Sequence, residues 1–350
     1  MRRVMKFAPV LLAGVLVMSA CGGDDDDAGG GGASSPAVTS NLKVGLAYDI
    51  GGRGDQSFND AAARGLDKSK VDFGIAEGNV NELEATAGET DAQKEERLRQ
   101  LAEGGYNPII AVGFAYSGPL GNVAKDFPEV KFAIIDDAAA KGPNIANLTF
   151  AENEGSFLVG VAAALKSEAN HIGFVGGVDV PLIHKFEAGY KAGAEAAKPG
   201  IKVDVTYLTQ PPDFTGFNDA AKGQTAASGM FDAGADVVYH AAGGSGGGVF
   251  TAAKTAGKMA IGVDSDQYNT ADPAVRDVII TSMLKKVDTA VYDFIKSMNG
   301  DQFAAGEKVY DLAADGVGYS TSGGKIDDIV PQIEEYKTKI VNGEITVPTS

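Results

Sequence analysis

From Leu42 onward, the chain alternates short apolar runs with longer segments of helical composition, and this alternation constrains the fold more than any other feature. Short apolar runs bounded by glycine or polar residues indicate buried strands, and the polar-rich segments between them indicate helices. We expect strands at Val44–Tyr48, Asp72–Glu77, Ile109–Val112, Lys131–Ile135, Ile145–Phe150, His171–Val175, Lys202–Leu208, Val237–Ala241 and Met259–Gly262. We expect helices at Asp91–Glu103, Gly118–Asp126, Phe157–Leu165, Lys185–Lys198, Lys222–Ala233 and Gly247–Ala256.

Two successive series of strands and helices predict an α/β protein with two doubly wound parallel-sheet domains joined by a hinge. Right-handed crossovers connect the strands of such sheets. The segment Glu152–Phe157 lies between the two series, and we interpret it as a crossing segment at the hinge. Two domains with such a hinge can close over a ligand.

The first strand leads into a loop that carries several chemically useful side chains. Asp49 ends the apolar run, and three glycines at positions 51, 52 and 54 allow unusual backbone angles. Ser57 and Asn59 are suitable N-cap residues for the helix that follows. Phe58 lies between them, and no helix cap requires an aromatic residue. Ligands of open α/β sheets bind outside the carboxyl ends of strands, so this loop is a candidate for a binding site.

The N-terminus has the pattern of an export signal. Basic residues among the first six precede the apolar run Phe7–Val17, which is too short to span a bilayer as a helix. Met18-Ser19-Ala20-Cys21 then resembles a lipobox, with Met18 in place of the usual leucine, and predicts cleavage after residue 20 and lipidation of Cys21. Residues 21–41 are rich in glycine, serine and aspartate, a composition that favours a flexible tether.

The net charge excludes one large class of function. The 350-residue chain has a formal charge of −17, which becomes −20 when 27 basic residues face 47 acidic ones after removal of Arg2, Arg3 and Lys6. A nucleic-acid-binding protein needs a basic face, so we expect no nucleic acid partner. Cys21 is the only cysteine, and an intramolecular disulfide is therefore impossible.

The motif of Asp49, Gly51-Gly52, Asp55 and Ser57-Phe58-Asn59 resembles the opening motif of the basic membrane protein (Bmp) family. These lipoproteins are the purine-nucleoside receptors of bacterial importers. The resemblance recurs at Pro181–Tyr190, at the glycine-rich segment Tyr239–Phe250 and at Gly262–Tyr268. It implies the fold of type I periplasmic binding proteins, in which Ile279–Lys286 is a strand that returns to the first domain. The implied division is 42–148 with about 265–305 for the first domain, and 149–264 with about 306–350 for the second.

The loops after the strands and the family motifs together give a candidate ligand site. Its expected residues are Asp49, Phe58, Asn59, Asp136, Phe186, Gly244, Asp264 and Lys285. Phe58 and Phe186 are expected to stack on the two faces of a purine, and Asp264 and Lys285 to bind the ribose. Asp49 or Asp136 is expected to accept N–H groups of the base. We expect structural roles for Asp266, Tyr116 and Tyr190, while His184 is open to either interpretation.

Other chemistries find less support. Gly243–Gly247 matches the G-x-S-x-G nucleophile elbow, but all three histidines precede Ser245, whereas that fold places its histidine after the serine. There is no phosphate-binding P-loop, and the Gly51–Gly54 segment lacks the third glycine of a dinucleotide fingerprint. No cluster of histidine and cysteine suggests a metal, so we expect neither metal nor cofactor.

We therefore expect a monomeric, lipid-anchored receptor on the extracytoplasmic face of the cell membrane. It would capture nucleosides and deliver them to the permease of an ABC importer. Two alternatives stay open from the residues alone. One is an enzyme that acts on nucleosides, and the other is a ligand-sensing lipoprotein that is not coupled to transport.

Overall fold

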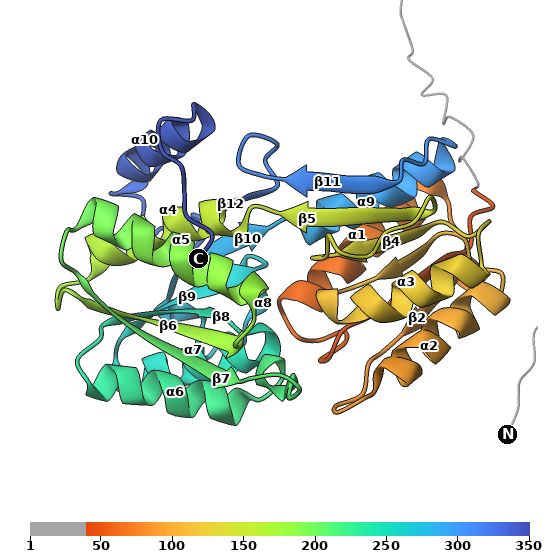
Figure 1. The fold of residues 1–350 in the computed structure, drawn as a ribbon. Helices are drawn as coiled ribbons and strands as arrows, with labels where there is room; N and C mark the ends of the chain where they lie inside the picture. Colours follow the sequence, from red (N-terminus) through yellow and green to blue (C-terminus); the bar gives the residue numbers. More distant parts are fainter. Residues whose placement is uncertain (1–39) are drawn as a thin grey trace, which may run out of the picture. The chain divides into compact units, whose positions relative to one another are not determined.

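The computed structural model describes residues 40–350, so the export signal, Cys21 and most of the tether lie outside the described residues. The described part contains two six-stranded sheets with helices packed against them, as Figure 1 shows. This arrangement confirms the predicted fold class of two doubly wound α/β domains. No helix among residues 40–350 is long and apolar enough to cross a bilayer.

The first sheet has the order β11-β5-β4-β3-β1-β2, and all its neighbouring strands are parallel. Its strands are β1 (Val44–Ala47), β2 (Val80–Leu83), β3 (Ile109–Ala111), β4 (Phe132–Ile135), β5 (Ile145–Phe150) and β11 (Gly306–Tyr310). Together with the helices α1 (Phe58–Phe73), α2 (Asp91–Glu103), α3 (Ser117–Asp126) and α9 (Val287–Asn299), they form what we call the first lobe.

The second sheet has the order β12-β10-β9-β8-β6-β7 and is parallel except for β12, which runs antiparallel to β10. Its strands are β6 (His171–Val178), β7 (Lys202–Thr209), β8 (Val237–Ala241), β9 (Met259–Asp264), β10 (Ile279–Lys285) and β12 (Val317–Tyr319). The second lobe adds the helices α4 (Glu152–Lys166), α5 (Pro181–Ala197), α6 (Ala220–Asp232), α7 (Gly246–Ala256), α8 (Gln267–Thr270) and α10 (Val330–Val341).

The hydrophobic core is continuous between the lobes. One cluster of buried side chains joins α1 and α9 of the first lobe to α4 and α5 of the second. Two smaller clusters cover the remaining faces, one under α2 and α3 and the other under α6 and α7. The inner parallel strands of both sheets, such as β1, β4, β5 and β8, are buried along their whole length, which is why they are near-continuous apolar runs in the sequence.

The contact between α4 and α5 depends on glycine. A Cβ atom added at Gly193 would lie 2.0 Å from the Phe157 carbonyl oxygen, and one at Gly160 would lie 2.2 Å from that of Tyr190. The two helices therefore pack backbone against backbone, and any larger residue at these positions would force them apart. This contact fixes α5, the helix that carries Phe186.

Several expected elements differ from the observed ones. Residues 72–77 are not a strand, because α1 continues to Phe73 and the strand at this edge is β2. Glu152–Phe157, interpreted from the sequence as the crossing segment, is the first part of α4, and the crossing itself falls just before it, between β5 and α4. The prediction that the strand at Ile279–Lys286 returns to the first domain is wrong, because this strand, β10, pairs with β9 and β12 in the second sheet. The following helix α9 does pack on α1 of the first lobe.

The chain passes between the lobes three times: between β5 and α4, between β10 and α9, and between β11 and β12. The strand β11 pairs with β5 in the first sheet, although the resemblance places residues from about 306 in the second domain. The domain boundaries themselves stay a prediction. All three passages lie beside the carboxyl ends of strands, which brings this part of both lobes together.

Candidate ligand-binding site

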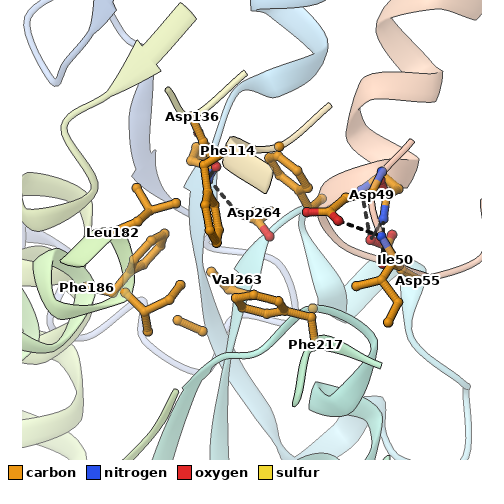
Figure 2. Close-up of a pocket in the computed structure, with 17 residues that line it drawn as sticks. Asp49, Ile50, Asp55, Phe114, Asp136, Leu182, Phe186, Phe217, Val263 and Asp264 are labelled. Carbon is orange, nitrogen blue, oxygen red and sulfur yellow. Dashed lines mark hydrogen bonds and ion pairs between the residues drawn. The ribbon is translucent and has the colours of Figure 1, made fainter. Parts of the chain in front are cut away.

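A cavity with about 540 Å³ of empty volume lies at the carboxyl ends of the strands, with walls from both lobes (Figure 2). This volume includes space that is open to solvent. We call it the central cavity. Its lining residues are Asp49, Ile50, Asp55, Phe58, Asn59, Gly113, Phe114, Asp136, Leu182, Ile183, Phe186, Phe217, Ala241, Gly243, Val263, Asp264 and Lys285.

The lining includes all of the site residues predicted from the sequence except one. Asp49, Phe58, Asn59 and Asp136 come from the first lobe, and Phe186, Asp264 and Lys285 from the second. Gly244 is not part of the wall; its neighbour Gly243, with φ +52°, takes that place. The geometry thus gathers side chains up to 236 positions apart, from Asp49 to Lys285 (285 − 49), around one space.

Lys285 forms ion pairs with two carboxylates of the cavity. Its Nζ lies 2.5 Å from Oδ2 of Asp136 and 3.7 Å from Oδ1 of Asp264, and the residue is only 3% exposed. Burial alone would lower the pKa of this ammonium, but Asp136, Asp264 and Glu152 outweigh that effect and raise it. The lysine is therefore charged at any physiological pH. A buried charge needs such partners to be tolerated.

The two aspartates that hold Lys285 have unusual backbone conformations. Asp136 follows β4 with φ +63°, and Asp264 ends β9 with φ +62°. Left-handed backbone is uncommon outside glycine, and such strain concentrates at functional sites. Burial raises the pKa of Asp264, while Lys285 and the Ser57 hydroxyl oppose that rise.

Glu152 at the start of α4 lies behind this charged group and is fully buried. Its Oε2 is 3.2 Å from Nζ of Lys185. Burial, and then the nearby Asp136, raise the pKa of Glu152 to about 7, against the opposing effect of Lys285 and Lys185. Among the described residues, Oε1 of Glu152 and Oδ1 of Asp136 are buried without a hydrogen-bond partner.

Asp55 caps α1, and this corrects the expectation that Ser57 and Asn59 do so. Its carboxylate accepts hydrogen bonds from the backbone N–H groups of Ser57 (2.9 Å), Asn59 (2.8 Å) and Asp60 (3.1 Å). The Ser57 side chain makes no capping bond and instead donates to Oδ2 of Asp264 at 2.7 Å. The sequence alone does not identify Asp55 as the capping residue, because serine and asparagine, which are also good N-cap residues, lie closer to the start of the helix.

Asp49 and Asn59 form the wall of the cavity in the first lobe. The side-chain oxygen of Asn59 accepts the Asp49 backbone N–H at 3.1 Å, and its amide donates to Asp55 at 3.1 Å. The Asp49 carboxylate accepts the Ile50 N–H at 2.8 Å and has no ion pair among residues 40–350. Burial raises the pKa of Asp49 to about 6, opposed by that hydrogen bond. At neutral pH, Asp49 is thus an ionised acceptor that faces the cavity.

Phenylalanine rings supply the apolar walls. The Lys285 Nζ lies 4.7 Å from the ring centroid of Phe58 and 5.4 Å from that of Phe186. Phe114 and Phe217 also line the space, with their ring centroids 6.4 Å apart in an edge-to-face arrangement. Figure 2 shows Leu182 and Phe186 on one side of Asp264, and Asp49 and Ile50 on the other. The lining of the cavity therefore combines aromatic rings with carboxylates and one ammonium group.

A family model described as ABC transporter substrate-binding protein PnrA-like (Bmp) matches residues 42–350. The chain is 34% identical over 370 residues to the ABC transporter nucleoside-binding protein BmpA of Lactococcus lactis, with 99% of each chain covered. The chain belongs to the Bmp family of ABC transporter substrate-binding proteins. This Bmp-family chain is also 36% identical over 355 residues to the CD4+ T-cell-stimulating antigen of Listeria monocytogenes, covering 97% of this chain and 96% of that protein.

Solved structures agree with the family assignment. An ABC transporter system solute-binding protein from Aeropyrum pernix matches with a TM-score of 0.76 and 30% identity, covering 88% of this chain and 94% of that one. Family and fold together confirm the resemblance found in the sequence. They describe substrate-binding proteins of transporters and not enzymes.

The structural roles expected for three residues fit the Bmp-family structure. Tyr116 and Tyr190 are fully buried, and the Tyr116 hydroxyl donates to the Tyr48 carbonyl at 2.8 Å. Asp266 accepts a hydrogen bond from Asn269 at 2.7 Å. His184 lies on α5, not in a loop, and its Nε2 is 2.7 Å from Asp179 on an exposed face. None of these four lines the central cavity.

The serine of the G-x-S-x-G motif is also committed to the fold. The Ser245 hydroxyl is fully buried, donates to the Gly216 carbonyl at 2.7 Å and accepts the Asp219 N–H at 2.7 Å. His240 lies in the core, where its Nε2 is 3.0 Å from Oε1 of Gln267. Burial lowers the pKa of His240 to about 4, so its imidazole is neutral. Ser245 thus joins the glycine-rich loop to the start of α6.

Two aromatic residues of the site were not among those predicted. Phe114 lies in the loop after β3, where the strand-end rule places ligands, but the sequence pattern cannot separate a wall residue from a core residue there. Phe217 comes from a short turn after the edge strand β7, and the nearest site residue expected from the sequence, Gly244, is 27 positions away (244 − 217). No local pattern identifies it, because only the packing of β7 beside β6 brings it to the cavity.

Proposed function

We propose that this protein is a lipid-anchored receptor that captures purine nucleosides in the central cavity and delivers them to an ABC importer. The single observation that carries the proposal is the combination of phenylalanine rings with the Asp136–Lys285–Asp264 cluster in one buried space. The printed name of the Lactococcus lactis relative, a nucleoside-binding protein, supports the same ligand class.

A purine nucleoside fits this chemistry in two parts. Its base has two flat faces, and stacking on an aromatic ring is worth about 1–3 kcal/mol for each base. Its ribose offers hydroxyl groups that both donate and accept, which suits a site where a carboxylate and an ammonium lie side by side. Phe58 and Phe186 are the proposed stacking pair, and Asp264 and Lys285 the proposed ribose partners.

The base edge has a separate proposed partner. Asp136 already holds Lys285 at 2.5 Å, whereas the Asp49 carboxylate accepts only the Ile50 N–H among residues 40–350. Asp49 is the proposed acceptor for N–H groups of the base, and Oδ1 of Asp136, which is unpartnered among residues 40–350, is the alternative acceptor. Asn59 supports Asp49 by fixing its backbone and the carboxylate of Asp55.

The charge balance favours nucleosides over nucleotides. Four carboxylates line the central cavity, from Asp49, Asp55, Asp136 and Asp264, against the single ammonium of Lys285. A phosphate group would enter a space with excess negative charge, and like charges at short range are strongly unfavourable in a buried site. We therefore expect nucleoside 5′-monophosphates to bind at least a hundredfold more weakly than nucleosides.

Membrane attachment and the transporter partner complete the proposal. Cys21 would carry the lipid at the extracytoplasmic face of the cell membrane, and residues 21–41 would give the folded part room to reach a permease. A monomer is proposed as the working unit. Membership of a family of transporter substrate-binding proteins supports this partner.

Calorimetric titration of the soluble protein from residue 22 with adenosine, guanosine, inosine, free bases, ribose and AMP tests the proposal. We expect stoichiometric binding of a purine nucleoside, weaker binding of its base and negligible binding of AMP. Chromatography of the same samples after long incubation separates a receptor from an enzyme, since only an enzyme would release free base. Absence of binding by any nucleoside would refute the proposed ligand class.

A further inference from the structure

A second hollow adjoins the central cavity, and the two share Asp49 and Ile50 as a common wall. We call it the outer hollow. It has about 1000 Å³ of empty volume, which includes space open to solvent, and lies between the loop before α2 and the loop after β7. Ala85, Thr86 and Lys94 line it from the first lobe, and Phe214 from the second. The ring of Phe214 is 6.0 Å from that of Phe114, which lines the central cavity.

The shared residue Asp49 decides which part of a ligand would face the outer hollow. The inference rests on the proposed function, in which Asp264 and Lys285 bind the ribose and Asp49 accepts N–H groups of the base. Figure 2 shows Asp49 and Ile50 on the side of Asp264 away from Leu182 and Phe186. A base that donates its exocyclic amino group to Asp49 therefore has that amino group at the border between the two spaces.

We propose that the receptor binds purine nucleosides whose exocyclic amino group carries a substituent, and that this substituent occupies the outer hollow. A singly substituted amino group keeps one N–H, which is the number that a hydrogen bond to Asp49 requires. The substituent replaces the other hydrogen of the amino group and so lies to one side of that hydrogen bond, where the outer hollow adjoins Asp49 and Ile50.

The walls of the outer hollow suit an apolar or uncharged substituent. Ile50, Ala85, Ala115 and Phe214 offer apolar surface. Most charges in the walls are paired, because Glu89 pairs with Arg97, Lys94 lies 3.4 Å from Asp91, and Asp213 lies 3.9 Å from Lys222. Asp49, the proposed partner of the amino group, is the lining carboxylate without an ion pair among residues 40–350. An aromatic substituent gains most, since it can pack against Phe214 and displace water from apolar walls.

The rim of the outer hollow sets no sharp limit on the length of a substituent. Thr86, Gly88 and Thr90 line it and are all exposed, so the hollow opens to solvent on this side. A long substituent can therefore extend past the rim. By contrast, the ribose end of the ligand would lie against buried residues, Asp264 at 8% exposure and Lys285 at 3%. We therefore expect the site to accept substituents on the edge of the base and to reject substituents on the sugar.

Calorimetry with matched ligands tests the inference on the soluble protein. The probes are adenosine, N6-benzyladenosine and 5′-O-benzyladenosine, together with guanosine and N2-benzylguanosine. For the parent nucleoside that binds more tightly, we expect its N-benzyl derivative to bind within tenfold of the parent. We expect 5′-O-benzyladenosine to bind at least a hundredfold more weakly than adenosine.

Variants that fill the outer hollow locate the substituent. Ala85→Phe places a ring in the hollow and should weaken the N-benzyl derivative at least tenfold, with the parent nucleoside changed less than threefold. Thr86→Phe, at an exposed lining position, is a second filling variant that does not depend on Ala85. Ala87→Phe is the matched control, because Ala87 is an exposed residue of the same loop that does not line the hollow. It should alter neither ligand.

The outcomes separate this inference from the proposed function. If no purine nucleoside binds, the proposed function fails, and the inference fails with it. If the parent binds but its N-benzyl derivative is at least a hundredfold weaker, the inference alone is wrong. Tolerance of the 5′-O-benzyl group with rejection of the N-benzyl group would show that the ligand lies the other way round. Equal losses of both ligands in Ala85→Phe and Thr86→Phe would also contradict the inference.

Discussion

Ser57, at the N-terminus of α1, donates a hydrogen bond of 2.7 Å to Oδ2 of Asp264 at the end of β9, 207 positions later in the chain. The bond joins the two lobes at the wall of the central cavity. Around it, the Ser265 hydroxyl donates to the Ser57 carbonyl at 2.8 Å, and Arg64 donates to the Ser265 hydroxyl at 2.9 Å. A residue expected to cap a helix is thus part of the connection between the lobes and orients a proposed ligand-binding carboxylate.

Ser57→Ala should therefore weaken both the fold and ligand binding. The change leaves one oxygen of the buried Asp264 without its hydroxyl donor, at a cost of about 1–3 kcal/mol. We expect a lower midpoint of urea unfolding and at least a threefold loss in nucleoside affinity. The control is Ser69→Ala, which removes a buried hydroxyl of the same helix at a position that does not line the cavity. Asn59→Ala would not serve as a control, because Asn59 lines the cavity. Equal nucleoside affinities in Ser57→Ala and Ser69→Ala would contradict the role of Ser57.

Phe58→Ala and Phe186→Ala test the stacking pair. Each change removes one aromatic face, which at about 1–3 kcal/mol corresponds to roughly tenfold to a hundredfold in affinity. The double variant should lose more than either single one. Calorimetry measures the loss, and circular dichroism checks the fold of each variant. If both single variants bind nucleosides as tightly as the parent protein, the two rings belong only to the core.

Asp264→Ala should discriminate between a nucleoside and its free base. The proposed partner of Asp264 is the ribose, and a hydrogen bond to a charged group is worth about 1.5–3 kcal/mol. We expect a loss of at least tenfold for the nucleoside and a smaller loss for the base. Since the change also removes a partner of Lys285, the ratio of the two affinities is the quantity to compare. An unchanged ratio would assign Asp264 to structure alone.

Glu152→Gln should change the pH dependence of stability. Because burial raises the pKa of Glu152 to about 7, the folded protein keeps a proton that the unfolded chain loses near pH 4.5. The stability gained from this proton is full below about pH 4.5 and is lost as the pH rises through about 7. Glutamine is neutral at every pH, so the melting temperature of the variant should rise relative to the parent between pH 5 and pH 8. The same difference at both pH values would rule out this titration.

Cys21→Ala tests the anchor. The residue lies outside the described part of the chain, and the prediction depends on Met18-Ser19-Ala20-Cys21 alone. We expect the variant to accumulate as uncleaved precursor without attached lipid, as shown by intact mass and metabolic labelling with a fatty acid. A processed variant that still partitions with membranes at the mass of the parent would show that the segment is not a lipobox.

The sequence by itself determined the class of the fold and most of the proposed site. Apolar runs such as Ile145–Phe150 and Val237–Ala241 match observed strands, since burial on both faces of a parallel sheet requires a continuous apolar run. Because ligand residues of such sheets follow strand ends, a local pattern was enough to select Asp49, Asp136 and Asp264. The family resemblance added Phe186 and Lys285, which no periodicity identifies.

Only the tertiary structure decided how these residues act together. The sequence could not place β10 in the second sheet, because an apolar strand fits either sheet equally well and the choice depends on pairing with β9. It could not show that Ser57 leaves its helix cap to Asp55 and reaches Asp264, since a hydroxyl binds whichever acceptor the fold brings near. Phe217 and the outer hollow likewise arise from the approach of loops distant in the chain. Local patterns therefore predict strands and the loops that follow them, whereas the contacts between the lobes depend on packing between segments that are distant in the chain.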